Sequence, residues 1–405
     1  MDPLEILTKS ERVVPFFQAI FSADEHRVIG YEILGRFQTG EEFESLGPFF
    51  QDVHIPEEFR IEIDNLVLTK ALEKALMSEE ETLLFINREL DLLMADNGEQ
   101  LLSILQEFEE KGLSLNRIVL EISEGNYNGD ITDLNHFLRY LKALGIKIAL
   151  DKMGEENGQL DRISQLSPDI LKVDLKALRT DIGNTTLKDI LFSISLLARK
   201  VGASLLFTSI EMDFQLQFAW LNGGRYYQGF FLHKPNSDFT EEYVCKKELQ
   251  SKFEKYIEHE KNKLAMVYRL ADGLQEKLQQ FFLSSKKGSE PDPTLKLIAE
   301  ELEDMSFRLY ICDENGIQQS SNYFKKDKNW ILQAEYKGKN WSWRPYFLEN
   351  IVKMNRDQKG LLSDLYSDLE TGQNIRTFSY PLKNGQFLFI DLSYEFLYEQ
   401  EGLLR

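Results

Sequence analysis

Six short apolar runs in the first 232 residues each end on an oxygen-bearing or charged side chain. The polar residues at or beside these ends are Glu32, Asn87, Glu121, Asp151, Asp174 and Gln228. Amphipathic helical patterns separate the runs, and repeated strand–helix alternation predicts a parallel sheet that closes into a barrel. Functional strand ends of such barrels lie on one face, so we expect these side chains to share one rim.

The expected elements up to residue 235 begin with a hairpin of two β-rich runs, 13–21 and 27–37, broken at Ala23-Asp24-Glu25. Further strands are expected at 82–87, 117–122, 146–151, 170–174, 204–208 and 226–232. Helices are expected at 59–77, 99–110, 130–144, 159–166, 186–201 and 212–221. The predicted class of this region is α/β.

Carboxylate and amide oxygens are hard ligands of the kind that Mg²⁺, Mn²⁺ and Ca²⁺ take in proteins. Such oxygens are supplied by Glu32, Asn87, Glu121, Asp151 and Asp174. The pattern therefore predicts a divalent-cation site at the rim, and such a site would act on an anionic ligand.

The formal net charge is −20, and no block of Lys and Arg offsets it. This charge disfavours nucleic-acid binding, so a bound anionic nucleotide would need the cation, Lys172 and Arg36. No apolar run has the roughly 18–20 residues that span a bilayer, and the acidic N-terminus lacks a signal-peptide pattern. The two cysteines, Cys245 and Cys312, have no metal-type spacing. We expect a cytoplasmic protein with no nucleic-acid and no membrane partner.

Residues 238–288 form a charged segment in which apolar residues recur at spacings of three and four, which is typical of a helix. One long helix fits, and so do two helices with a break near Gly273. The apolar stripe either packs on the chain's own two domains or forms a signalling helix and dimer seam. Both alternatives remain open from the sequence.

Residues 289–405 combine helices and strands in an α+β pattern that small sensor modules share. Helices are expected at 294–304 and 344–354, and strands at 307–312, 330–336, 375–382 and 386–393. Lys383-Asn384-Gly385 predicts a hairpin turn. We expect Trp341 and Trp343 to fill the core of this domain; a ligand site at this aromatic segment is the alternative.

Several motifs of the first domain stand in a fixed order. Glu-x-Leu-x-Arg reads Glu32-Ile33-Leu34-Gly35-Arg36, with Phe17-Gln18-Ala19-Ile20 upstream. Asn87, Glu121-Ile122-Ser123-Glu124, Asp151, Lys172-Val173-Asp174, Gln228-Gly229 and Pro235 follow. In these motifs about residues 10–240 resemble the EAL family of cyclic-di-GMP phosphodiesterases. The whole chain is similar to EAL proteins that carry a TIM-barrel-like domain (1–237), a helical linker (238–288) and a PAS-like sensory domain (289–405).

The resemblance implies a role for each motif residue. Glu32, Asn87, Glu121 and Asp151 would hold a divalent cation, with Asp174 in support; Lys172 would steady the attacking water or a phosphate, and Glu124 would brace the loop after Asp151. The nucleotide would contact Gln18, Leu34, Arg36 and Gln228. The family chemistry is metal-assisted attack of water on a phosphodiester, preferably with two cations about 4 Å apart.

The chain departs from the family pattern where two acidic residues are expected. Lys152 replaces the second residue of an Asp-Asp pair that serves the second metal, and Thr208 replaces the first Glu of Glu-Gly-Val-Glu. The Gly-rich loop after Asp151 is also altered. A lysine near a vacated metal site repels a cation by about 4 kcal/mol per unit pair at 4 Å and an effective dielectric of 20. We therefore expect one cation (Mg²⁺ or Mn²⁺, with Ca²⁺ possible) and a cyclic-di-GMP receptor with weak or no hydrolysis.

The alternative is an active phosphodiesterase that produces linear pGpG. A homodimer is expected by resemblance, since symmetric dimers are common and the helical segment offers a seam. The terminal domain would bind an unknown small molecule or protein.

Overall fold

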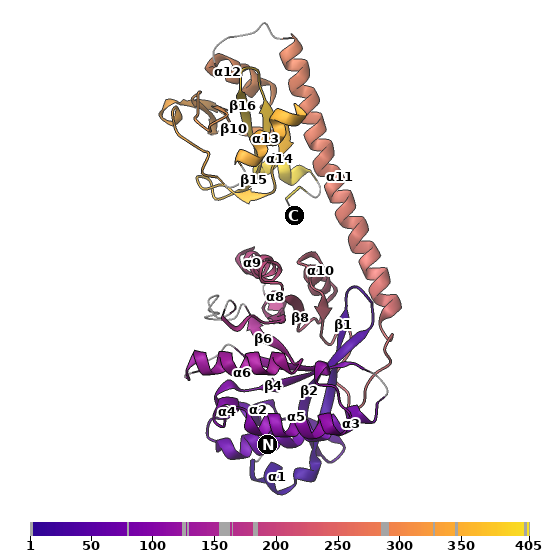
Figure 1. Cartoon of the computed structure of the whole chain (residues 1–405). Coiled ribbons are helices and arrows are strands. Elements are labelled where there is room, and N and C mark those ends of the chain that lie inside the picture. Colours follow the sequence, from indigo (N-terminus) through magenta and orange to yellow (C-terminus); the bar gives the residue numbers. More distant parts are fainter. Residues whose placement is uncertain are drawn as a thin grey trace. The chain divides into compact units, whose positions relative to one another are not determined.

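The computed structural model describes residues 3–78, 81–123, 127, 129–153, 163, 165–180, 185–284, 291–326, 329–344, 347–400 and 403–404. The chain divides into two compact units, Met1–Glu254 and Lys255–Arg405 (Figure 1). No helix within these described ranges is both long and apolar enough to cross a membrane.

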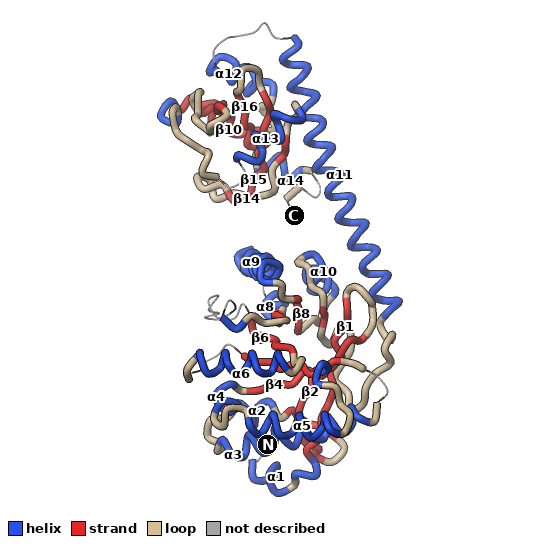
Figure 2. Tube along the Cα trace, viewed as in Figure 1, coloured by secondary structure: helices blue, strands red, loops and turns tan. Residues whose placement is uncertain are grey.

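In the described part of the first unit, eight strands close into a barrel, which confirms the predicted TIM-barrel-like α/β class (Figure 2). They are β1 (Val13–Ser22), β2 (Val28–Thr39), β4 (Leu83–Arg88), β5 (Ile118–Ser123), β6 (Lys147–Met153), β7 (Ile170–Asp174), β8 (Ser204–Thr208) and β9 (Tyr226–Tyr227). Their order is β1-β9-β8-β7-β6-β5-β4-β2, and β1 pairs with β2 to complete the ring. Strand β1 is antiparallel to both neighbours because it forms the predicted hairpin with β2. The short β3 (Glu42–Ser45) extends the edge of β2.

Helices alternate with these strands and cover the outside of the barrel. They are α1 (Pro3–Thr8), α2 (Gly47–Gln51), α3 (Glu57–Leu76), α4 (Leu90–Met94), α5 (Glu99–Glu110), α6 (Ile131–Ala143), α8 (Lys176–Thr180), α9 (Thr185–Val201) and α10 (Asp213–Leu221). The helix expected at 159–166 lies largely outside the described residues. The strand expected at 226–232 is shorter than predicted, because the chain turns at Gly229 to pack against the backbone of Ile210.

One apolar layer fills the barrel interior, and six strands each contribute one residue to it. These residues are Ile20, Phe85, Val119, Ala149, Ile170 and Leu206. The layer forms because inward positions recur every second residue along a strand. The side chains at the next inward positions, two residues closer to the carboxyl ends of the strands, rest on this layer.

Helix α11 (Lys246–Ser284) is one continuous helix that runs through Gly273. In the first unit its Phe253 contacts Trp220 and Tyr227. In the second unit its Leu274 and Leu278 join a hydrophobic core. The apolar stripe thus packs on each unit at its own end, while Leu264 and Tyr268 remain 54% and 68% exposed.

The second unit is built on an antiparallel sheet, which confirms its α+β class. Its elements are α12 (Pro291–Glu301), β10 (Ser306–Asp313), β11 (Asn322–Lys326), β12 (Asn329–Gln333), α13 (Phe347–Asp357), β13 (Leu361–Leu362), β14 (Tyr366–Ser367), β15 (Asn374–Pro381), β16 (Gln386–Leu392) and α14 (Tyr394–Glu399). The strand order is β12-β11-β10-β16-β15-β13. Asn384 and Gly385 both have positive φ in the turn from β15 to β16, as the hairpin prediction requires.

Alternation along β10 and β16 separates the two faces of this sheet. Leu309 and Ile390 pack in the core that includes residues of α11 and α12, whereas Tyr310 and Phe389 pack with α13. The prediction that Trp343 fills the core is wrong, because its side chain is 65% exposed. Trp341 is half-buried and packs against the α13 side of the core.

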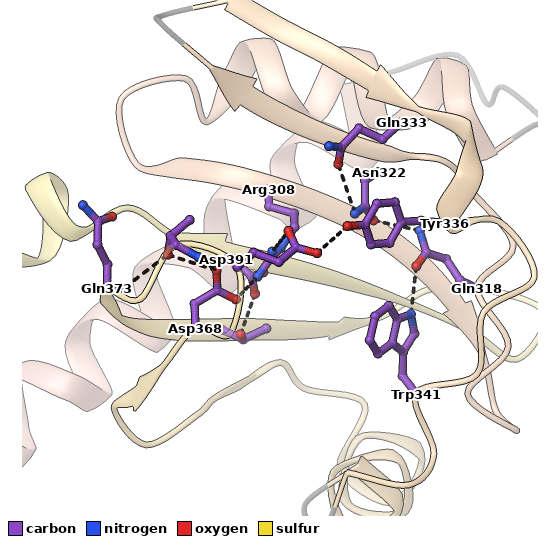
Figure 3. A network of polar contacts seen from close by, with 12 residues as sticks. Arg308, Gln318, Asn322, Gln333, Tyr336, Trp341, Asp368, Gln373 and Asp391 are labelled. Atoms are coloured by element: carbon purple, nitrogen blue, oxygen red, sulfur yellow. Dashed lines mark hydrogen bonds and ion pairs between the residues drawn. The ribbon is translucent and has the colours of Figure 1, made fainter.

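A buried arginine organises the polar part of the second unit (Figure 3). Arg308 Nε donates to Asp391 at 2.6 Å, and its Nη2 donates to Asp368 at 2.5 Å. Its Nη1 donates to Glu370 at 2.9 Å, and the Tyr336 hydroxyl donates to the same carboxylate. The three carboxylates come from β16 and from the turn between β14 and β15, so Arg308 ties that turn to the sheet.

Candidate functional site

Polar side chains gather at the carboxyl end of the barrel because they lie two residues beyond the interior layer. On five strands, the interior residue and the polar residue two positions after it form a pair: Phe85 and Asn87 on β4, Val119 and Glu121 on β5, Ala149 and Asp151 on β6, Ile170 and Lys172 on β7, and Leu206 and Thr208 on β8. The strand registers are staggered around the barrel: Asn87 pairs with Glu121, but Glu121 pairs with Ala149 and Lys172 pairs with Leu206. The carboxyl ends of the parallel strands still share one face of the barrel. The rim inferred from the apolar runs is therefore present.

Lys172 lies at the centre of this set and is 2% exposed. Its Nζ is 2.6 Å from Glu121 Oε2 and 3.3 Å from Glu32 Oε2. Asp151 Oδ1 is 4.0 Å away. Burial alone would lower the pKa of Lys172, but the three nearby carboxylates outweigh burial and raise it. Lys172 is therefore a fixed positive charge among carboxylates.

Glu32 is hydrogen-bonded through both of its carboxylate oxygens. Asn87 Nδ2 donates to Oε1 at 2.7 Å, and Gln228 Nε2 donates to Oε2 at 2.6 Å. Burial raises the pKa of Glu32, but Lys172 and the two amides outweigh burial and lower it. Glu32 is thus held as a charged carboxylate in a single orientation.

Glu121 is 1% exposed, and only one of its oxygens is engaged. Oε2 accepts from Lys172, whereas Oε1 has no hydrogen-bond partner in the described part of the chain. Burial and the charge of Glu32 raise the pKa of Glu121 well above its usual range, although Lys172 opposes them. A buried oxygen without a partner costs free energy until something binds to it.

Within the described residues, no three His, Cys, Asp or Glu side chains form a ready-made metal cluster. The carboxylates of Glu32, Glu121 and Asp151 converge on Lys172 instead. The donors are nevertheless the hard oxygens that divalent cations prefer. The unpartnered Oε1 of Glu121 gives such a cation one free oxygen ligand, so these residues fit a bound cation.

A cavity of about 610 Å³ opens beside this rim. Among the residues predicted for the site, its walls include Leu34, Arg36, Asn87, Glu121 and Asp151. Its volume is that of a pocket for a small molecule or cofactor. Arg36 Nη1 is bonded to Gly35 O at 3.0 Å, which leaves other donors of its guanidinium for a ligand.

The remaining predicted residues lie around this centre. Gln18 is half-buried on β1, where it pairs in register with Glu32. Asp174 ends β7, and its Oδ1 accepts from the backbone amide of Lys176 at the start of α8. Glu124 lies outside the described residues, as does most of the altered loop after Met153. Lys152 lies on β6, where the pairing with β7 shifts register between Leu150 and Met153.

Thr208 ends β8 opposite Asp174, and Ser209 after it has a φ of 56°. A left-handed backbone favours glycine, so Ser209 is in a strained conformation. Gln215, which is fully buried, holds this turn: its Oε1 accepts from the backbone amides of Glu211 and Met212 at 2.8 and 3.0 Å. Its Nε2 donates to Leu175 O at 2.8 Å.

Gly229 is expected to be essential for the position of Gln228. A Cβ at this residue would lie 2.0 Å from Ile210 O and 2.4 Å from Ile210 N. Gly229→Ala should therefore lower the free energy of unfolding by about 1–3 kcal/mol in urea denaturation, because the backbone must move. Gly273→Ala is the control: apart from the adjoining residues and backbone of its own helix, nothing among the described residues lies within 4 Å of the added Cβ, and helix propensity rises. Equal stability of the two variants would contradict the close packing of Gly229 against the backbone of Ile210.

Several charged residues of the cavity wall were not predicted from the sequence. The wall includes Arg60 and Asp64 of α3, Arg88 at the end of β4 and Glu89 just after it. Arg60 and Asp64 are four residues apart on a face that also buries Ile63 and Val67. Charged residues within an apolar helix stripe were the signal that could have identified them.

Two families match the chain. The EAL domain family matches residues 3–235, and the family of EAL-domain associated signalling protein domains matches residues 239–404. The EAL-domain containing protein YkuI of Bacillus subtilis (strain 168) is 52% identical over 406 residues, which cover 100% of both chains. The crystal structure of B. subtilis YkuI in complex with substrate c-di-GMP and calcium has a TM-score of 0.95 and also covers 100% of both chains.

Two further similar proteins cover part of the chain. The cyclic di-GMP phosphodiesterase PdeA of Borreliella burgdorferi is 30% identical over 188 residues, which are 43% of this chain and 26% of that protein. The PaMucR phosphodiesterase, in complex with c-di-GMP, covers 58% of this chain and 98% of its own, with a TM-score of 0.52 and 20% identity. The likeness to PaMucR shows a shared fold.

Proposed function

The chain belongs to the EAL-domain family, and we propose that its barrel binds cyclic-di-GMP with one divalent cation as a signalling receptor with weak or no hydrolysis. The observation that carries the proposal is the full-length likeness to a protein crystallised with c-di-GMP and calcium. The cavity beside the rim supports it with a volume suited to a nucleotide.

The cation would be held by Glu32, Asn87, Glu121 and Asp151, with Asp174 in support. When bound, a divalent cation neutralises phosphate charge and polarises the phosphodiester. Arg36 would bind a phosphate through its planar fork, and Lys172 would contribute a fixed positive charge. Gln18, Leu34 and Gln228 would contact the nucleotide, and Glu124 would brace the loop after Asp151.

Two substitutions argue against efficient hydrolysis. Lys152 and Thr208 stand at positions where the family has acidic residues, which bind the second metal and activate the attacking water. A threonine hydroxyl is neutral and a poor base at neutral pH, and a lysine opposes a second cation. Sites whose parts act together lose most of their rate when one essential part is removed.

The second candidate is an active phosphodiesterase that converts cyclic-di-GMP to linear pGpG. It is favoured by the B. subtilis complex, in which c-di-GMP is named as a substrate, and by the retained acidic residues. Calorimetric titration of cyclic-di-GMP, with and without Mg²⁺ or Ca²⁺, followed by chromatography of the mixture, separates the candidates. Micromolar binding without pGpG supports the receptor, rapid pGpG formation supports the enzyme, and absence of binding overturns both.

The double variant Lys152→Asp with Thr208→Glu is expected to hydrolyse cyclic-di-GMP at least about tenfold faster than the wild type, because it restores the acidic residues of the second metal site. Chromatographic pGpG formation at saturating Mg²⁺ or Mn²⁺ measures the gain. Lys147→Asp with Ser204→Glu makes comparable changes at the opposite ends of the same two strands and should have no such effect. An unchanged rate in the first variant would count against a degenerate site.

We also propose a homodimer, a cytoplasmic location, and a terminal domain that binds a small molecule or protein. Light scattering of the purified chain tests the first of these. The exposed Leu264 and Tyr268 of α11 support a helical seam.

A further inference from the structure

An arginine and a glutamate form an ion pair on the cavity wall, outside the motifs that identified the rim. Arg60 Nη1 of α3 lies 2.9 Å from Oε2 of Glu89, the residue just after β4. The Arg60 side chain is 7% exposed, whereas that of Glu89 is 50% exposed. Both residues line the cavity that also contains Asn87 and Glu121.

Local structure does not explain the orientation of Glu89. It is the N-cap residue of α4, yet its side chain accepts no capping hydrogen bond. Its carboxylate bonds to Arg60 instead, a residue 29 positions away in the sequence. Arg60 Nε is buried and has no hydrogen-bond partner among the described residues. A buried guanidinium with an unused donor is costly for stability. The pair is therefore better explained by a role of the Glu89 carboxylate in binding a ligand in the cavity.

The charge of Glu89 decides which part of a cyclic dinucleotide it can meet. A carboxylate repels phosphates, which would be drawn to Arg36, Lys172 and the cation. The bases are therefore the part of the dinucleotide that Glu89 can contact. An ionised carboxylate accepts hydrogen bonds but donates none. Guanine presents two adjacent donors, N1–H and the N2 amino group, which match the two oxygens of a carboxylate. Adenine presents an acceptor at N1. The half-buried Phe50, also on the wall, offers a ring for the base to stack on.

We propose that Glu89, oriented by Arg60, accepts N1–H and N2–H of one guanine and so determines the base specificity of the cavity. This inference rests on the proposed binding of cyclic-di-GMP. Glu89 is the residue that contacts the base, and Arg60 is a positioning residue that holds the carboxylate toward it. Neither Arg60 nor Glu89 is among the residues proposed to hold the cation, so a change here alters base recognition without removing a cation ligand.

The test combines Glu89→Gln with ligands that differ at the base. Cyclic-di-GMP, cyclic-di-IMP, which lacks the N2 amino group, and cyclic-di-AMP are titrated calorimetrically into the full chain. The wild type should bind cyclic-di-GMP at least about tenfold more tightly than cyclic-di-IMP, since removal of one donor leaves a carboxylate oxygen unpaired. Glu89→Gln should weaken cyclic-di-GMP by about 10–100-fold and reduce its preference over cyclic-di-IMP.

Glu242→Gln is the matched control, because Glu242 also pairs with an arginine at 2.9 Å but does not line the cavity. It should bind all three ligands like the wild type. Arg60→Met should reduce the same base preference, and Arg60→Lys should restore part of it, whereas a purely structural role would shift the melting temperature alone. Unchanged base preference in Glu89→Gln, with normal wild-type binding, overturns this inference and leaves the proposed function standing. No binding by the wild type overturns both.

Discussion

Replacing Lys172 with methionine is expected to lower the free energy of unfolding by about 3–5 kcal/mol. The ammonium lies 2.6 Å from Glu121 and 3.3 Å from Glu32, and it is nearly inaccessible to solvent. Its removal leaves those carboxylates buried together without a counter-charge, while methionine preserves most of the side-chain volume. Urea denaturation at neutral pH, in the presence of a chelator, measures the loss.

Divalent cations should restore more stability to Lys172→Met than to the wild type, because a bound cation stabilises the native state by mass action and replaces the missing charge. Lys111→Met is the control: Lys111 pairs with Glu107 on an exposed helix surface, and its loss should cost less than about 1 kcal/mol. A Lys172→Met protein as stable as the wild type, or one indifferent to Ca²⁺ and Mg²⁺, would contradict the assignment of a carboxylate-lined cation site.

Replacing Arg308 with methionine should lower the stability of the second unit by about 3–5 kcal/mol. Arg308 is buried, and its guanidinium satisfies Asp391, Asp368 and Glu370 at once (Figure 3). Without it, two buried carboxylates have no ionic partner and the turn between β14 and β15 is released. Three of the four tryptophans, Trp330, Trp341 and Trp343, lie in this unit, so fluorescence during urea denaturation measures its unfolding.

Arg356→Met serves as the comparison, since Arg356 is 74% exposed and pairs only with its neighbour Asp357 among the described ion pairs. It should change stability by less than about 0.5 kcal/mol. Adding Asp368→Asn and Asp391→Asn to Arg308→Met should recover part of the loss, because neutral amides no longer leave buried charges unpaired. No loss in Arg308→Met would show that the network is dispensable.

Much of the barrel could be predicted because its signals are local. The apolar runs alternate with amphipathic helices, and each run ends where a strand ends, so β4 to β8 lie where they were expected. The positions of Asn87, Glu121 and Asp151 followed from the same pattern. Because side chains alternate along a strand, a residue two positions beyond an inward-facing one is predicted to face inward from the local sequence alone.

Other features were not predictable in this way. Strand β11 (Asn322–Lys326) was missed because its polar residues pair between β10 and β12 rather than forming an apolar run. The short β9 follows from the contact of Gly229 with Ile210, which no sequence window contains. Arg60 and Glu89 were missed because each resembles an ordinary surface charge until α3 and the end of β4 come together.

The order of polar strand ends along the chain determined the barrel, its rim and the family, since hydrophobic periodicity and motif spacing are properties of the chain itself. Tertiary structure decided that Lys172 stands between the carboxylates, that Glu121 keeps one oxygen without a partner, and that Glu89 faces the cavity. These outcomes depend on distances between strands and helices far apart in sequence. Burial raises the pKa of Glu121, whereas the nearby carboxylates outweigh burial and raise the pKa of Lys172; both environments arise only when the strands close.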